Sequence, residues 1–229
     1  MTYMAIMKKR TMTKEEFSKL LFLLDNSLED RESLTSTVKL LLLGGREFSG
    51  RNINTGIKDG SDIDDFETKY QTYCSKRFIG LFLYLMLLEV IGSTFNRKDK
   101  PSSENDIKRA LDLFSDKITD DCFNEISGLR NSLAHRFSLC TENKGAGKSF
   151  CYNLLWDKTT FIVEKPKFGD EWSGDFSTKI DKSSTKIGVE NLIEHIEDIY
   201  TKLITELKSG ELETIPDIPE LKARYTISI

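Results

Sequence analysis

Residues 78–91 read FIGLFLYLMLLEVI, the most hydrophobic run of the chain, and this run decides the fold class. Apart from Gly80 and Glu89, apolar and aromatic side chains occupy every side of a helix built from it, so the run predicts a helix buried in the centre of a bundle. A helix that crosses a bilayer needs about 20 apolar residues. We therefore expect a core helix and no association with a membrane.

Helical periodicity on both sides of this run predicts further helices. Thr13 and Glu16 have the spacing of a capping box, which favours a helix that starts there. Gly44 and Gly45 are expected to end a second helix, because glycine adopts the left-handed conformation found at helix ends. The predicted helices after the first one cover residues 32–43, 61–95, 103–118, 119–137 and 189–208. His195 falls on the polar side of the last of them, where we expect it to be solvated.

Three segments between the predicted helices carry further predictions. Residues 150–156 and 161–163 alternate apolar and polar side chains around Asp157-Lys158, which predicts a β-hairpin over 149–164. Residues 44–61 and 165–187 predict long loops. The fold class expected is mainly α: one domain over residues 1–229, with a bundle of about five to six helices over 13–208, a small β-hairpin insertion, and a tail at 210–229 packed as an extended arm.

Composition limits the classes of function. The chain has 229 residues and a formal net charge of −4, whereas a broad grip on nucleic acid needs a strongly basic face. Any nucleic-acid chemistry therefore requires a local basic site. No Cys-x-x-Cys pair exists among the four cysteines, and the chain has two histidines, so we expect no metal and no cofactor. The cysteines predict reduced thiols in a cytoplasmic protein, and the N-terminus lacks the pattern of a signal peptide.

Residues 119–137, TDDCFNEISGLRNSLAHRF, carry the candidate chemistry. One stripe of the predicted helix is apolar, and a second stripe contains Asn131 and His135, which are four positions apart and so share a face. Gly128 lies on the same stripe, where we expect it to leave an open patch for another molecule. Arg130 lies about 100° from Asn131 around the helix, close enough for its long side chain to reach the same neighbourhood.

An arginine, an asparagine and a histidine at one helix end suit phosphodiester cleavage. Histidine titrates near neutral pH and can move a proton to or from an RNA 2′-hydroxyl or a leaving oxygen. Arginine braces the phosphate as negative charge builds. Because the 2′-hydroxyl is then the nucleophile, the reaction needs no metal.

The run from Arg130 through Asn131 to His135 resembles the arginine, polar residue, spacer and histidine motif of the HEPN family, the higher eukaryote and prokaryote nucleotide-binding proteins. The resemblance implies a metal-independent endoribonuclease that leaves a cyclic phosphate. His135 would handle protons, Arg130 would stabilise the phosphate and Asn131 would position them. Some families add an acidic residue from another helix, for which Glu89 is the candidate.

The resemblance also implies partners. Members commonly pair as homodimers, and many are toxins or phage-defence effectors, so RNA, a second copy of the chain and an antitoxin or regulatory protein are the expected partners. Two alternatives stay open. One is a non-catalytic HEPN-like module that binds a nucleotide or a protein partner, and the other is a helical regulatory subunit that makes contact through residues 165–187.

Overall fold

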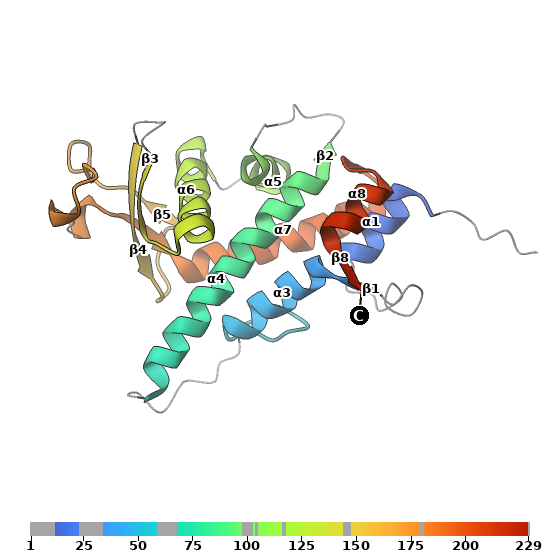
Figure 1. Cartoon of the computed structure of the whole chain (residues 1–229), viewed down its shortest axis with the longest axis horizontal. Helices are drawn as coiled ribbons and strands as arrows, with labels where there is room; N and C mark the ends of the chain where they lie inside the picture. The colour runs from blue at the N-terminus through green and yellow to red at the C-terminus, as the bar shows by residue number, and fades with distance from the viewer. Residues whose placement is uncertain are drawn as a thin grey trace, which may run out of the picture.

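The structure, a computed structural model, describes residues 12–22, 34–58, 68–97, 103, 105–115, 118–143, 148–178 and 181–228. This part of the chain is mainly helical. It contains seven α-helices: α1 (Lys14–Phe22), α3 (Thr37–Phe48), α4 (Thr68–Thr94), α5 (Asp106–Phe114), α6 (Asp120–Arg136), α7 (Val189–Ser209) and α8 (Ile218–Tyr225). A small sheet lies at one end of the molecule and α1 and α8 lie at the other, with α4 running between them (Figure 1).

Helix α4 forms the centre of the core, as the apolar run predicts. Its fully buried side chains are Leu81, Tyr84, Leu85, Leu87, Leu88 and Ile91. The stretch Ser75–Thr94 is long and apolar enough to cross a membrane, but 56% of its most apolar window is buried inside the protein. This burial is typical of a core helix. The start predicted for this helix at Ser61 lies outside the described residues.

The ends of α1 and the inward face of α7 confirm two local predictions. The backbone N–H of Thr13 donates to the Glu16 carboxylate (2.9 Å) and the N–H of Glu16 donates to the Thr13 hydroxyl (3.2 Å), which completes the capping box. Helix α7 spans Val189–Ser209 and ends at Gly210 in the left-handed conformation. The apolar side chains that recur along it at helical spacing are all buried: Val189, Leu192, Ile196, Ile199, Leu203 and Leu207.

The helix end predicted at Gly44 and Gly45 is wrong, because α3 continues through both residues to Phe48. A side chain at Gly45 would lie 3.3 Å from the ring of Tyr84, and one at Gly44 would lie 3.0 Å from Leu83. The two glycines therefore bring α3 close to α4. The helix also begins later than predicted, at Thr37, directly after strand β1 (Leu34–Ser36).

The hairpin predicted over 149–164 is also wrong. Strand β4 (Lys148–Leu155) pairs antiparallel with β3 (Cys140–Asn143) and parallel with β6 (Thr185–Gly188). Strand β5 (Val163–Glu164) pairs with β6 on its other side, so the order is β3-β4-β6-β5. Alternation identified the strand but not its partners, because β6 lies 30 or more residues away in the chain.

Residues 210–229 form more than the extended arm that was expected. Strand β7 (Leu212–Thr214) pairs antiparallel with β2 (Phe95–Arg97), which directly follows α4. Helix α8 then packs at the end of the core, and β8 (Thr226–Ser228) pairs antiparallel with β1. The segment thus links the C-terminal end of α4 with the strand that precedes α3.

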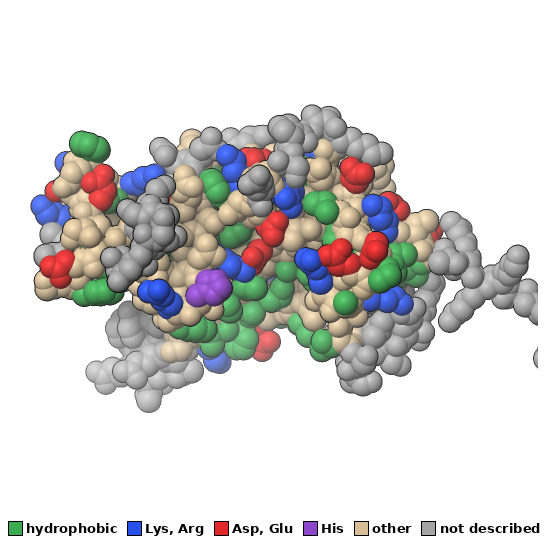
Figure 2. All heavy atoms as spheres, turned by 45° about the horizontal axis from the view of Figure 1, so that its top comes forward, with side chains coloured by type: hydrophobic (Ala, Val, Ile, Leu, Met, Phe, Trp, Pro, Cys, Tyr) green, Lys and Arg blue, Asp and Glu red, His purple; other side chains and the backbone are tan. Residues whose placement is uncertain are grey.

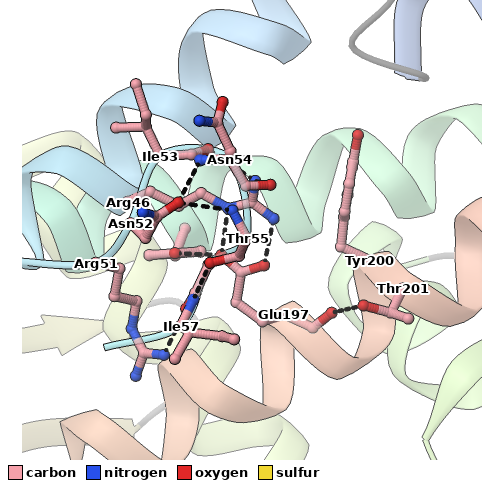
Figure 3. Close-up of polar contacts among 12 residues, drawn as sticks. Arg46, Arg51, Asn52, Ile53, Asn54, Thr55, Ile57, Glu197, Tyr200 and Thr201 are labelled. Carbon is pink, nitrogen blue, oxygen red and sulfur yellow. Dashed lines mark hydrogen bonds and ion pairs between the residues drawn. The ribbon is translucent and has the colours of Figure 1, made fainter. Parts of the chain in front are cut away.

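A buried ionic cluster joins α3, α4 and α7. Glu197 of α7 accepts from Arg46 of α3 at 2.9 Å and 2.7 Å (Figure 3). Glu190, whose side chain is 3% exposed, pairs with Arg51, Arg77 and Lys58. Burial, together with nearby Arg77 and Arg51, lowers the pKa of Lys58. Glu190 thus contacts three cations, of which Arg51 and Arg77 are buried and Lys58 is 49% exposed.

His195, expected in solvent, is 6% exposed and therefore buried. It lies between the inward positions Leu192, Ile196 and Ile199 of α7. The buried face of this helix is wider than the apolar stripe alone predicts, because residues 161–162, which line a pocket together with His195, cover its side.

Replacing Gly92 by Ala is expected to lower the free energy of unfolding by about 1–3 kcal/mol, the usual effect of overpacking. The added methyl group would lie 1.7 Å from the carbonyl oxygen of Asp106, where α4 approaches the start of α5. Gly44→Ala is the matched control, because its new methyl group meets only the flexible end of Leu83. Urea unfolding of both variants measures the difference, and equal midpoints would contradict this close helix contact.

Candidate functional site

The motif helix α6 has one buried and one exposed face. It begins after Thr119, and Phe137 ends it in the left-handed conformation with φ of 49°. Its inward side chains Ile126, Leu129 and Leu133 are 0% exposed. Asn131 and His135 lie on the exposed face. Packing of the apolar stripe therefore fixes which side of the motif faces solvent.

Arg130 is held between two acceptors. Its Nη2 donates to the carboxylate of Glu89 on α4, and its Nη1 donates to Oδ1 of Asn131 at 2.9 Å. The side chains of Arg130 and Glu89 are 15% and 25% exposed. The long arginine side chain thus reaches the Asn131 side of the helix. The structure brings together three of the four residues singled out from the sequence.

The pairing of Arg130 orients the guanidinium without using all of its donors. A guanidinium carries five N–H groups, and the two contacts above engage one on each terminal nitrogen. Nε of Arg130 is buried and has no hydrogen-bond partner among the described residues. The other two terminal N–H groups have no hydrogen-bond partner within the described part of the chain.

His135 follows Asn131 by one helical turn and is exposed to solvent. Within the described parts of the chain, no hydrogen bond or ion pair joins it to Arg130, Asn131 or Glu89. In the view of Figure 2, a histidine lies on the surface next to a patch of hydrophobic side chains. The imidazole of His135 is therefore accessible to a ligand from solvent. Arg130 lies on the same helix, five residues earlier.

The open patch expected at Gly128 does not exist. A side chain at this position would lie 2.4 Å from the hydroxyl of Tyr152 and 3.1 Å from the ring of Phe150. The Tyr152 hydroxyl donates to the carbonyl of Glu125 at 3.1 Å. Gly128 is therefore the point at which β4 packs against α6. The absence of a side chain there lets the sheet come close to the helix and leaves no space for a ligand.

An aromatic pocket of about 620 Å³ lies next to the end of α6. The ring of Phe137 packs against Phe78 and Phe82 of α4, with centroid distances of 6.0 Å and 5.7 Å. The apolar and aromatic walls of the pocket come from Phe78, Ile79, Phe137, Tyr152, Leu154 and Trp156. Sequence reasoning missed this pocket, because its lining comes from four separate segments of the chain. The aromatic residue directly after the motif was the one available signal.

The residues that the structure describes contain no group of three or more histidine, cysteine or acidic side chains arranged to hold a metal ion. Among the described residues, Cys122, Cys140 and Cys151 form no disulfide bond, and the sulfur atoms of Cys140 and Cys151 lie 3.1 Å apart. The side chain of the fourth cysteine, Cys74, lies outside the described part.

Comparisons of the chain with protein-family models, with curated proteins and with solved structures find no match in any of the three.

Proposed function

We propose that the protein is a metal-independent endoribonuclease of HEPN type, with Arg130, Asn131 and His135 as its catalytic motif and Glu89 as a positioning residue. The observation that carries this proposal is that Glu89 and Asn131 together hold the guanidinium of Arg130, while Asn131 and exposed His135 lie one turn apart on the same face of α6. An acidic side chain from a second helix is what the family resemblance implies for the motif.

The proposed reaction is transesterification by the RNA itself. His135 removes the proton from the 2′-hydroxyl, the 2′-oxygen bonds to phosphorus, and the bond from phosphorus to the 5′-oxygen breaks. The leaving oxygen takes a proton from water or from the histidine of a second copy of the chain. The products are a 2′,3′-cyclic phosphate and a 5′-hydroxyl, so electrons and protons balance without a cofactor.

Arg130 has the role of stabilising charge on the phosphate as the bond to phosphorus forms. A preorganised donor costs no reorganisation at the moment of reaction, and the contacts of Arg130 with Glu89 and Asn131 supply that preorganisation. Homodimerisation, a cytoplasmic location, and action as a toxin or phage-defence effector controlled by an antitoxin or regulatory protein belong to the same proposal. So does the assignment of residues 13–208 to an HEPN-like helical core.

Replacing Arg130 by Ala is expected to reduce the rate of RNA cleavage by about 10²–10³-fold, the usual effect of losing one preorganised donor. Arg136→Ala is the matched control, because Arg136 is an exposed arginine on the last turn of the same helix. Initial cleavage rates of the parent and both variants, with circular dichroism to verify folding, measure the effect. Equal loss in both variants, or none in Arg130→Ala, would contradict the proposed role.

A second candidate function is a non-catalytic module that binds a nucleotide or a protein partner. The ion pair between Glu89 and Arg130 favours the form that binds a protein partner, because the carboxylate offsets the positive charge that a phosphate of RNA or of a nucleotide would meet. The net charge of −4 points the same way. Binding of a nucleotide without RNA cleavage by the parent protein would support this alternative.

A further inference from the structure

The aromatic pocket beside α6 has the dimensions of a ligand site. Its volume of about 620 Å³ falls within the range of about 300–1,000 Å³ that is typical of small-molecule pockets. Phe78 and Ile79 of α4 form one wall, Phe137 forms the edge next to the motif, and Tyr152, Leu154 and Trp156 form the wall on the sheet side. Figure 1 shows that α6 lies beside this sheet.

One wall is held rigidly. The guanidinium of Arg77 lies 5.1 Å from the centroid of the Trp156 ring, and its Nη2 donates to the Trp156 carbonyl at 3.0 Å. Arg77 is itself fixed by buried Glu190. The cation–π contact with the ring and the hydrogen bond to the backbone therefore both restrain Trp156.

The opposite edge is exposed. Phe137 is 64% exposed. Its backbone adopts the left-handed conformation, which residues other than glycine, asparagine and aspartate seldom occupy. Phe137 thus has a backbone conformation that is rare for phenylalanine, and much of its ring is exposed to solvent. Asn153, Asp181 and Ser184 add polar groups to the otherwise apolar lining.

The pocket and Arg130 lie along the same pair of helices. Phe137 contacts Phe82, and Arg130 contacts Glu89. These two contacts are seven residues apart on both helices, which corresponds to about 10 Å along a helix axis. Because the order of the contacts is reversed, α4 and α6 run in opposite directions here.

We propose that this pocket binds one unstacked base of an RNA strand, next to the phosphate that Arg130 contacts. The inference rests on the proposed function. Bases have flat apolar faces, which stack on aromatic side chains, and polar edges, which suit the few hydrogen-bonding groups of the lining. The pocket is thus a subsite that the sheet adds to the motif helix, and it selects RNA whose bases are free to leave the stack.

The test measures binding of a fluorescein-labelled single-stranded hexamer of 2′-O-methyl RNA by fluorescence anisotropy. This probe has no 2′-hydroxyl and cannot be cleaved by the proposed reaction, so binding is separated from catalysis. Phe137→Ala is expected to weaken binding by about 5- to 150-fold, as loss of one base-stacking contact does. Alanine, like phenylalanine, carries a Cβ and disfavours the left-handed conformation, so the substitution removes the ring without relaxing the backbone. The matched control is Phe168→Ala, because Phe168 is 100% exposed and lies outside the pocket lining.

A second readout uses the tryptophans. The chain has two, and Trp172→Phe leaves Trp156 as the single emitter. The hexamer is expected to quench its fluorescence, and Phe137→Ala added to this variant is expected to remove most of the quenching. This measurement reports on the pocket itself and not on total affinity.

The outcomes separate the subsite from the nuclease. Equal affinities of Phe137→Ala and Phe168→Ala, or no binding of the hexamer by the parent protein, would overturn the subsite even if unmodified RNA is cleaved. Binding that depends on Phe137, with no cleavage of unmodified RNA, would keep the subsite and remove the nuclease. Affinity and quenching that both fall only in Phe137→Ala support the proposal.

Discussion

Replacing Glu190 by Gln is expected to lower the free energy of unfolding by about 3–5 kcal/mol, the usual effect of removing one partner from a buried ion pair. The Glu190 side chain is 3% exposed, and so is that of Arg51, which contacts it at 3.1 Å. Arg77, 8% exposed, contacts the same carboxylate. A neutral amide would leave both guanidinium groups buried without their counter-charge.

The matched control for this variant is Glu194→Gln on the same helix. Its carboxylate is 48% exposed and lies 3.9 Å from the ammonium of exposed Lys158, and such surface pairs contribute about 0–1 kcal/mol. Urea unfolding of both variants gives the comparison, with a lower midpoint and an unchanged slope expected for Glu190→Gln. Similar midpoints for the two variants would contradict the assignment of Glu190 as the centre of the buried cluster.

Replacing His135 by Ala is expected to lower the rate of RNA cleavage by about 10²–10⁴-fold, the usual contribution of a general acid or base. The side chain is exposed, so the variant is expected to fold with nearly the stability of the parent. Initial rates on a single-stranded RNA, measured beside the unfolding midpoint, separate lost chemistry from lost structure.

Rescue distinguishes a chemical role of His135 from a contribution to packing. Imidazole added to the His135→Ala variant is expected to restore part of the rate, because the exposed position leaves room for a free base on the same face. Arg130→Ala is expected to gain nothing from imidazole. A purified His135→Ala protein that cleaves as fast as the parent would contradict the role of this residue.

The sequence predicted the ends of helices correctly where contacts between residues close together in the chain determine those ends. The capping box at Thr13 and Glu16 formed as expected, and α6 begins just after Thr119 and ends just before Phe137. These features depend on side chains within one turn of the helix end.

The predictions that were wrong depend on partners far away in the chain. Gly44 and Gly45 have the local pattern of a helix end, but the approach of Tyr84 and Leu83 on α4 makes them contact points inside a helix. The pairing of β4 with β6, across more than 30 residues, was equally invisible to local alternation. Tertiary packing overrode the local preference in both cases.

The candidate site also contains one feature that local sequence predicts and one that depends on tertiary packing. The shared face of Asn131 and His135 follows from helical spacing, whereas the contact of Glu89 with Arg130 requires α4 and α6 to cross at a defined point. The odd charge of Glu89 in an apolar run was a usable signal for that contact. Gly128 carried no such signal, since the sheet that covers it comes from a later segment.

The most direct test of the central claim is the chemistry of the RNA ends produced with a metal chelator present. The parent protein is expected to leave 2′,3′-cyclic phosphate and 5′-hydroxyl ends at an undiminished rate, and His135→Ala prepared in parallel is expected to leave almost none. Cleavage that stops with the chelator, or that leaves 5′-phosphate and 3′-hydroxyl ends, would contradict a metal-independent reaction at Arg130 and His135.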